Sequence, residues 1–384
     1  MVTRRGFLMG SGVAAAGIAG AGYYFVARPI MHPKPAVIGF TLTEGELTRA
    51  RDFMKANPVI DSHAHPGRTF LKGAENLTTK IKLYRMLGGV FAEKTIADMA
   101  QGGVASAVFN GVADVQLLTL GETGLTAGRD FMAGEAWASY QRQVGNLKAL
   151  VDTGAVSLCL TADDILAAHA RGKPAAMLGM EGADFLETDI SRLDQVYADG
   201  ARMLTLVHYR DSSIGDMMTG GSTRGLTAFG VDVVARMNDL GMMIDIAHAS
   251  EKMAFSVLEK SRQPVVLTHS HINSPALSHP RFISAELAAG VVETGGYIGA
   301  WPAGIGIASL AGFIDRIEEL VETVGEDHVA MGSDMDANYK PVLDTYRNMP
   351  LVVGALMKRG YSDTRLTKIL GGNFLRVMRV VQGV

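Results

Sequence analysis

The amino-acid sequence predicts an α/β fold of the (β/α)8 type, a TIM barrel. Beyond residue 56, eight short runs of apolar and β-branched residues alternate with longer segments of helical periodicity. Apolar strands separated by helices indicate a parallel sheet covered on both faces, and eight such units favour a closed barrel. A doubly wound open sheet is the alternative, but the sequence lacks the glycine-rich turn expected after its first strand.

The predicted elements occupy residues 31–384, which we interpret as one (β/α)8 domain. The predicted strands are residues 58–65, 103–112, 175–183, 201–209, 241–249, 264–272, 295–303 and 328–337. Among the helices between them, one begins after Thr161 as its N-cap and stops at Gly172, and two others end at Gly241 and Gly325. The connection from 113 to 174 is the longest, and we expect it to hold extra helices at the mouth of the barrel.

The composition excludes several classes of function. The chain is 48% hydrophobic and 20% charged with a formal net charge of −3, as is usual for a globular protein. No lysine or arginine run follows the first few residues, so we expect no nucleic-acid partner. A single cysteine, Cys159, rules out an internal disulfide and a thiolate metal cluster, and its apolar neighbours favour a buried structural role.

Residues 1–30 have a different character from the rest of the chain. Arg4 and Arg5 precede Phe7 and Leu8, and residues 10–27 carry no charge, a pattern that resembles a twin-arginine export signal. A chance arginine pair on a disordered tail is the alternative. No clean cleavage site precedes Arg28, so an uncleaved segment of about 18 residues would be just long enough to span a bilayer. We therefore expect an exported, periplasmic protein that an uncleaved segment would tether to the cytoplasmic membrane.

Polar side chains gather at one end of the predicted barrel. Histidine or carboxylate residues stand at the C-terminal ends of six of the eight predicted strands: His63, His65, Glu181, His208, His248, His269 and Asp334. In a parallel barrel these ends converge, and active sites are built there. A lone strand histidine is commonly a hydrogen-bonded core residue, but the placement of all seven at the same end favours a functional site.

The residue types in this ring point to metal-dependent hydrolysis. His63 and His65 are two residues apart on a strand, so both can face one cation, and imidazole with carboxylate suits zinc or another divalent ion. Glu181 could bridge two metals, with His248 and His269 completing the second site. Two metals would generate hydroxide near neutral pH and polarise a carbonyl oxygen. We leave His32, His169 and His328 in structural roles, and for His271 we favour a loop position or a role in supporting a ligand. Asp61 either orients His63 or caps a loop.

Five segments in order resemble successive blocks of the membrane (renal-type) dipeptidases, zinc enzymes of the amidohydrolase-like barrel class. They are "EGADFLETDISRLDQVYADGARMLTLVHYRDSSIGD", "GLTAFGVDVVARMNDLGMMIDIAHAS", "PVVLTHSHINSPALSHPRF", "MGSDMDA" and "GGNFLRVM", and the resemblance runs from about residue 58 to 380. It implies two zinc ions as cofactors and a small dipeptide as substrate, with an L- or D-residue at the C-terminal position. Some members also take β-lactams. Whether the chain forms a homodimer is left open.

The resemblance also implies a role for each residue of the ring. His63 and His65 would bind one zinc ion, Glu181 would bridge, and His248 and His269 would bind the other. His208 would contact the scissile carbonyl and its tetrahedral intermediate, Arg281 would hold the substrate carboxylate, and Asp334 would carry a proton to the leaving amine.

Three positions depart from the usual pattern of that family. His65 stands where the family usually has aspartate, Asp334 begins "DMDA" in place of "DFDG", and Arg281 lies one residue further from His269 than expected. Histidine at position 65 keeps a metal ligand but lacks the negative charge of aspartate, so we expect the affinity for metal, or the preferred metal, to differ.

The sequence therefore predicts a metal-dependent dipeptidase. Two alternatives remain, a related amidohydrolase that acts on another small amide, ester or lactone, and an exported barrel that has lost catalysis and only binds a ligand.

Overall fold

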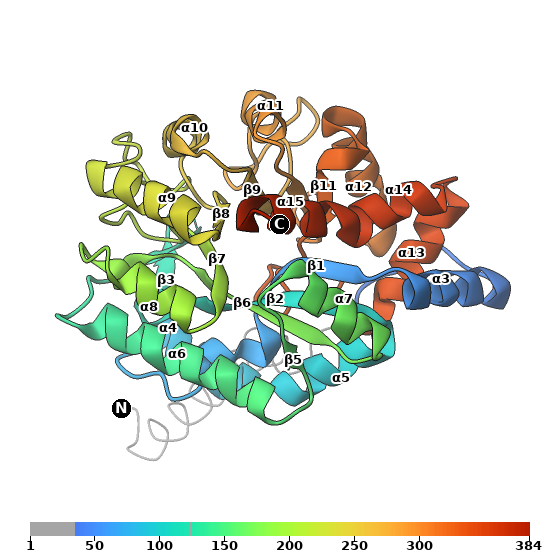
Figure 1. The fold of residues 1–384 in the computed structure, drawn as a ribbon, viewed down its shortest axis with the longest axis horizontal. Helices are drawn as coiled ribbons and strands as arrows, with labels where there is room; N and C mark the ends of the chain where they lie inside the picture. The colour runs from blue at the N-terminus through green and yellow to red at the C-terminus, as the bar shows by residue number, and fades with distance from the viewer. Residues whose placement is uncertain (1–34, 123) are drawn as a thin grey trace, which may run out of the picture.

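The protein is a closed parallel barrel surrounded by helices (Figure 1). The computed structural model describes residues 35–122 and 124–384. The barrel strands are β1 (Val59–Ala64), β2 (Val104–Val112), β6 (Ala175–Glu181), β7 (Ala201–Thr205), β8 (Met243–Asp245), β9 (Val265–Ser270), β10 (Ile298–Ala300) and β11 (Val329–Met331). Each of the eight predicted strands forms, so the predicted TIM barrel is confirmed.

Parallel pairing runs around the barrel in the order β1, β2, β6, β7, β8, β9, β10, β11 and back to β1. Two pairs that are distant along the chain close the circle. Asp61 of β1 stands opposite Met331 of β11, and β2 pairs with β6 from Ser106 opposite Ala175 to Val112 opposite Glu181. A short additional strand, β5 (Ser157–Leu158), pairs with the start of β6.

The helices that cover the strands begin and end largely where the sequence predicts. Thr161 caps α7 by accepting a hydrogen bond from the backbone N–H of Asp164, and Gly241 ends α9 in a left-handed conformation that glycine adopts without strain. Gly325 ends α12 as predicted. The helices are α3 (Glu44–Ala56), α4 (Thr79–Gly88), α5 (Ala92–Gly102), α6 (Glu135–Asp152), α7 (Ala162–Ala170), α8 (Arg192–Ala198), α9 (Ala228–Leu240), α10 (Glu251–Lys260), α11 (Ala285–Glu293), α12 (Leu310–Val324), α13 (Met349–Lys358), α14 (Asp363–Thr367) and α15 (Asn373–Gln382).

The connection between β2 and β6 contains more than the extra helices that we expected at the mouth. Helices α6 and α7 do form, but the part of the connection that reaches the cavity described below is an antiparallel hairpin of β3 (Leu118–Gly121) and β4 (Gly124–Ala127). Strand alternation of only four residues is too short to distinguish from a loop by periodicity.

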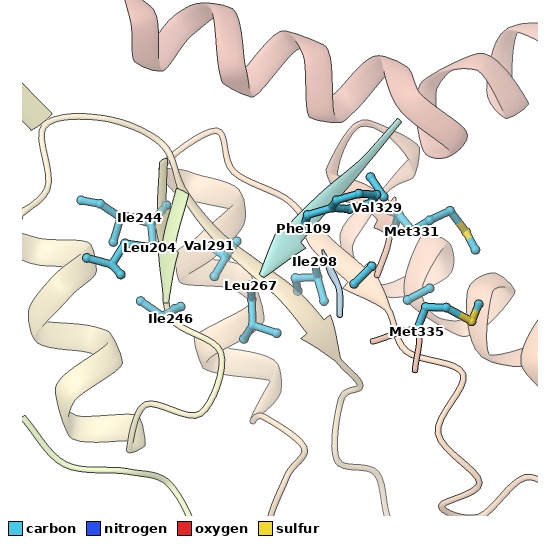
Figure 2. Packing of buried hydrophobic residues seen from close by; sticks show 14 of the residues in the cluster. Phe109, Leu204, Ile244, Ile246, Leu267, Val291, Ile298, Val329, Met331 and Met335 are labelled. Atoms are coloured by element: carbon cyan, nitrogen blue, oxygen red, sulfur yellow. The ribbon is translucent and has the colours of Figure 1, made fainter. Parts of the chain in front are cut away.

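Two apolar layers follow from the alternation of side chains along each strand. Leu204, Ile244 and Leu267 pack in one layer, shown with its neighbours in Figure 2. The residues immediately before them, Met203, Met243 and Val266, belong to a second cluster with Phe374 and Met378 of α15. Since this cluster includes residues at the starts of strands, α15 covers the N-terminal end of the barrel and leaves the opposite end for the site.

Within the two described ranges, no helix combines the length and the apolar character needed to cross a membrane. The predicted signal segment, residues 1–30, lies outside the described residues.

Candidate metal centre

Glu181, the last residue of β6, lies at the centre of five imidazoles. Its Oε1 is 2.9 Å from Nε2 of His248, 3.4 Å from Nε2 of His63 and 3.5 Å from Nε2 of His269. Its Oε2 is 3.3 Å from Nε2 of His65 and 3.3 Å from Nε2 of His208. One buried carboxylate therefore lies between both predicted histidine pairs, with His63 and His65 on one side and His248 and His269 on the other, each within 3.5 Å of one of its oxygens.

The predicted pairs of histidines are close together. Nε2 of His63 is 3.2 Å from Nε2 of His65, and Nε2 of His248 is 3.2 Å from Nε2 of His269. All four side chains are buried. His248 also adopts φ 67°, a left-handed conformation that residues with a side chain seldom take and that often marks functional positions.

Partners on Nδ1 orient the rings. Nδ1 of His65 is 3.1 Å from the backbone oxygen of Asn110, and Nδ1 of His208 is 2.6 Å from Oδ1 of Asp114. The hydroxyl of Thr268 lies 3.1 Å from Nδ1 of His63 and 3.0 Å from Nδ1 of His269. With Nδ1 engaged, each of these four rings presents Nε2 toward Glu181, which is the arrangement that metal-binding imidazoles require.

Asp114, Asn110 and Thr268 were missed by the sequence analysis. Asn110 is a polar residue inside the apolar run of β2, and that was a usable signal. Asp114 follows β2 by two residues and meets His208 across 94 residues of chain, so no local spacing points to it.

Asp334 reaches the same cluster from the loop after β11. Its Oδ1 is 3.3 Å from Nε2 of His65, and its backbone N–H donates to the backbone oxygen of His63 at 2.9 Å. Its φ is 52°, a second left-handed position in the site. Asp336, in contrast, accepts hydrogen bonds from the N–H of Gly67 and the hydroxyl of Thr95, so it fastens the loop.

Asp61 orients backbone rather than a histidine ring. Oδ1 accepts from the N–H groups of His63 and Ser333, and Oδ2 accepts from the hydroxyls of Ser333 and Tyr346. The carboxylate thus ties the end of β1 to the loop after β11. Of the two roles proposed for Asp61, anchoring the loop is the one observed.

Arg281 lies in the cavity beside the second pair of histidines. Its Nη2 donates to Nε2 of His248 at 2.9 Å and to Nε2 of His269 at 3.2 Å, and its guanidinium carbon lies 5.3 Å from the centre of the Trp301 ring. Although Arg281 lies one residue further from His269 along the chain than expected, its guanidinium still lies beside the histidine cluster.

Burial and charge set the protonation of the cluster. Burial opposes ionisation of Glu181, but the surrounding imidazoles, led by His208 and His63, hold the pKa of its carboxyl well below its usual range. Burial holds the pKa of His248 and of His269 well below the usual value, and Arg281 reinforces this. Burial also disfavours protonation of His65, yet its bonds to Asp334 and Glu181 outweigh burial and raise its pKa to about 10.

The donor set fits a divalent metal. Three groups of residues could each hold a metal ion, because within each group one donor atom per residue lies within 4.8 Å of the others. The groups are His63 with His65 and Asp334, His63 with Glu181 and His269, and Glu181 with His208 and His248. Imidazole and carboxylate without thiolate suit zinc and similar ions. Cys159 is buried elsewhere in the second cluster, and burial raises the pKa of its thiol to about 12.

Of the other histidines of the described chain, His279 lines the cavity described below, where its Nδ1 accepts a hydrogen bond from the backbone N–H of Arg281 at 3.1 Å. The remaining three have structural environments. Nε2 of His271 pairs with Glu319 at 3.0 Å, and Nδ1 of His328 is 2.8 Å from the backbone oxygen of Gly296. His169 is half-buried near the opposite end of the barrel, where α7 ends. His32 lies outside the described residues.

A cavity of about 630 Å³ opens over the cluster. Glu181, His208, His248, Arg281 and Asp334 line its floor and sides, and the β3–β4 hairpin and α4 contribute further lining residues. The predicted substrate-contacting residues His208 and Arg281 therefore share one cavity with Asp334 and with two of the candidate metal ligands, Glu181 and His248.

A TIM barrel that gathers histidine and carboxylate side chains at the C-terminal ends of its strands defines a metal-dependent hydrolase. The chain belongs to the membrane dipeptidase family, peptidase family M19, whose model matches residues 47–384. The resemblance inferred from the sequence blocks is confirmed.

Similarity to individual proteins supports the assignment to this family. The chain is 27% identical over 260 residues to dipeptidase verJ of Clonostachys rogersoniana and 28% identical over 305 residues to dipeptidase 3 of Rattus norvegicus, covering 65% and 72% of this chain. The matched stretches span 67% and 62% of those two relatives. A metallopeptidase from Rhodobacter sphaeroides, solved with a phosphinate mimic of L-Ala-D-Ala, shares the fold with a TM-score of 0.70 at 23% identity, over 85% of this chain and 99% of that one.

Proposed function

We propose that the protein is a dipeptidase that holds two zinc ions and hydrolyses dipeptides with an L- or D-residue at the C-terminal position. The observation that carries the proposal is the position of Glu181, whose carboxylate lies within 3.5 Å of the Nε2 atoms of both predicted histidine pairs. His63 and His65 would hold one ion and His248 and His269 the other, with Glu181 shared. When bound, such ions supply a hydroxide near neutral pH and polarise the scissile carbonyl.

The remaining polar groups of the cavity have complementary tasks. Arg281 presents a fixed positive charge that can hold the substrate's C-terminal carboxylate. Asp114 favours the protonated form of His208, whose Nε2–H can then donate to the carbonyl oxygen as it gains negative charge. Asp334 can accept a proton from the attacking water at Oδ1 and return it to the leaving amine.

The proposal is tested by metal analysis of the folded protein together with a screen of L,L and L,D dipeptides. We expect about two equivalents of zinc and hydrolysis of several dipeptides, both lost on chelation and restored by zinc. Metal binding without hydrolysis of any dipeptide, but with cleavage of another small amide, ester or lactone, would favour the related amidohydrolase. Metal binding with no turnover of any of these would favour a ligand-binding barrel.

We further propose that residues 1–30 export the folded protein through the twin-arginine route and tether it to the membrane. Replacing Arg4 and Arg5 with lysine should retain the protein in the cytoplasm, because this route depends on the arginine pair. Fractionation of cells that express the wild-type and double-variant chains measures the outcome. Equal export of both would show that the pair is incidental.

A further inference from the structure

The cavity over the cluster has two walls of different composition. On the side of His65, whose ring centre lies 5.5 Å from that of Phe70, the wall belongs to a cluster of buried apolar residues. Its members that line the cavity are Phe70, Ile81, Val112, Val115 and Leu118. On the side of His269, the wall is formed by Trp301, with Arg281 lying over its ring. A bound dipeptide would therefore place its two residues in different surroundings.

The position of Arg281 fixes which residue of the substrate meets which wall. If Arg281 holds the C-terminal carboxylate beside His248 and His269, the scissile bond lies over Glu181. The N-terminal residue then extends toward the apolar wall on the His65 side. This orientation rests on the proposed function.

Lys80 introduces a positive charge into that apolar wall. It stands in the first turn of α4, lines the cavity and is half-buried, and its loss of water lowers the pKa of its ammonium group. No carboxylate oxygen lies within 4.0 Å of its Nζ among the residues that the structure describes. The neighbouring Lys82 is exposed.

Arg68, the other cation on this side, is already engaged. Its Nε donates to the backbone oxygen of Asp336 at 3.0 Å, and its guanidinium lies 4.3 Å from the centre of the Tyr84 ring. Among the described residues that line this wall, Lys80 is thus the cation that remains available to a ligand. A charge that is partly removed from water gains from a partner of opposite sign, and apolar surroundings strengthen that attraction.

We propose that Lys80 binds an anionic group on the side chain of the substrate's N-terminal residue, so that preferred dipeptides begin with an acidic residue. The methylene groups of such a side chain would pack on Ile81 and Leu118, and its carboxylate would reach the Lys80 ammonium. Glutamate satisfies both requirements, whereas glutamine has the same shape without the charge.

The test compares kcat/KM for L-Glu-L-Ala, L-Gln-L-Ala and L-Leu-L-Ala. The wild-type protein should prefer the glutamate substrate to the glutamine substrate by roughly tenfold, the size expected for a charge-assisted hydrogen bond at a partly exposed site. Lys80→Gln should bring this ratio close to one, mainly by raising KM for L-Glu-L-Ala. Lys82→Gln, the exposed neighbour on the same helix, is the matched control and should keep the wild-type ratio.

A second variant keeps the proposal falsifiable if Lys80→Gln folds poorly. Lys80→Glu should reverse the preference, so that L-Lys-L-Ala becomes a better substrate than L-Glu-L-Ala. An unchanged glutamate-to-glutamine ratio in Lys80→Gln, or an equal loss on all substrates, would overturn the proposal. If the wild-type protein hydrolyses L-Leu-L-Ala but shows no preference for L-Glu-L-Ala over L-Gln-L-Ala, the proposed role of Lys80 is wrong while the dipeptidase proposal stands. If it hydrolyses no dipeptide, both proposals are wrong.

Discussion

Replacing Glu181 with alanine is expected to reduce bound metal below the wild-type value of about two equivalents and to abolish dipeptide hydrolysis. The physical reason is the position of the carboxylate, whose Oε1 faces His63, His248 and His269 and whose Oε2 faces His65 and His208. Removing it takes a ligand from both proposed ions at once and leaves the imidazoles without the charge that balances bound cations. Metal content of the purified protein and turnover of the best dipeptide give the measurement.

The controls separate a bridging ligand from a buried structural glutamate. Glu187→Ala changes a partly exposed carboxylate in the loop after β6 and should retain both metal and activity. Thermal unfolding of each variant establishes that the protein is folded. A folded Glu181→Ala protein with unchanged metal stoichiometry would contradict the binuclear proposal, because a structural glutamate would affect stability and leave the metal in place.

The barrel was predictable because its signals are local. Each strand is a short apolar run, and helix ends such as Thr161 and Gly241 are set by hydrogen-bonding and backbone preferences of the residues themselves. The hairpin of β3 and β4 was not predicted, since two strands of four residues give little periodicity and their pairing depends on docking beside α4. The hydroxyl of Thr78 at the start of α4 bonds the backbone oxygen of Leu118 and contributes to this docking.

The candidate ligands were predictable for a topological reason. Residues at the C-terminal ends of parallel strands converge whatever their separation in sequence, so His63 and His269 could be placed together without coordinates. The residues that orient the rings could not be predicted in this way. Thr268 contacts the His63 ring, and Asp114 contacts His208, through lateral packing between strands and loops that spacing does not encode.

Replacing Asp334 with asparagine is expected to reduce kcat by about two to four orders of magnitude while metal content stays close to wild type. The carboxylate lies at the cluster, with Oδ1 3.3 Å from Nε2 of His65, where it can take a proton from the attacking water and return it to the leaving amine. An amide keeps the shape and hydrogen bonds but cannot accept that proton. Asparagine also tolerates the left-handed φ of 52° at this position, so the loop should keep its conformation.

Asp336→Asn provides the matched control for this prediction. It changes a carboxylate two residues away with the same left-handed backbone, φ 71°, but Asp336 bonds Gly67 and Thr95 instead of the histidine cluster. It should therefore lower thermal stability and retain most of kcat. Full kcat in Asp334→Asn would refute a role for Asp334 in proton transfer. Loss of metal from Asp334→Asn would instead make Asp334 a metal ligand. Its carboxylate forms such a group with His63 and His65, in which one donor atom per residue lies within 4.8 Å of the others.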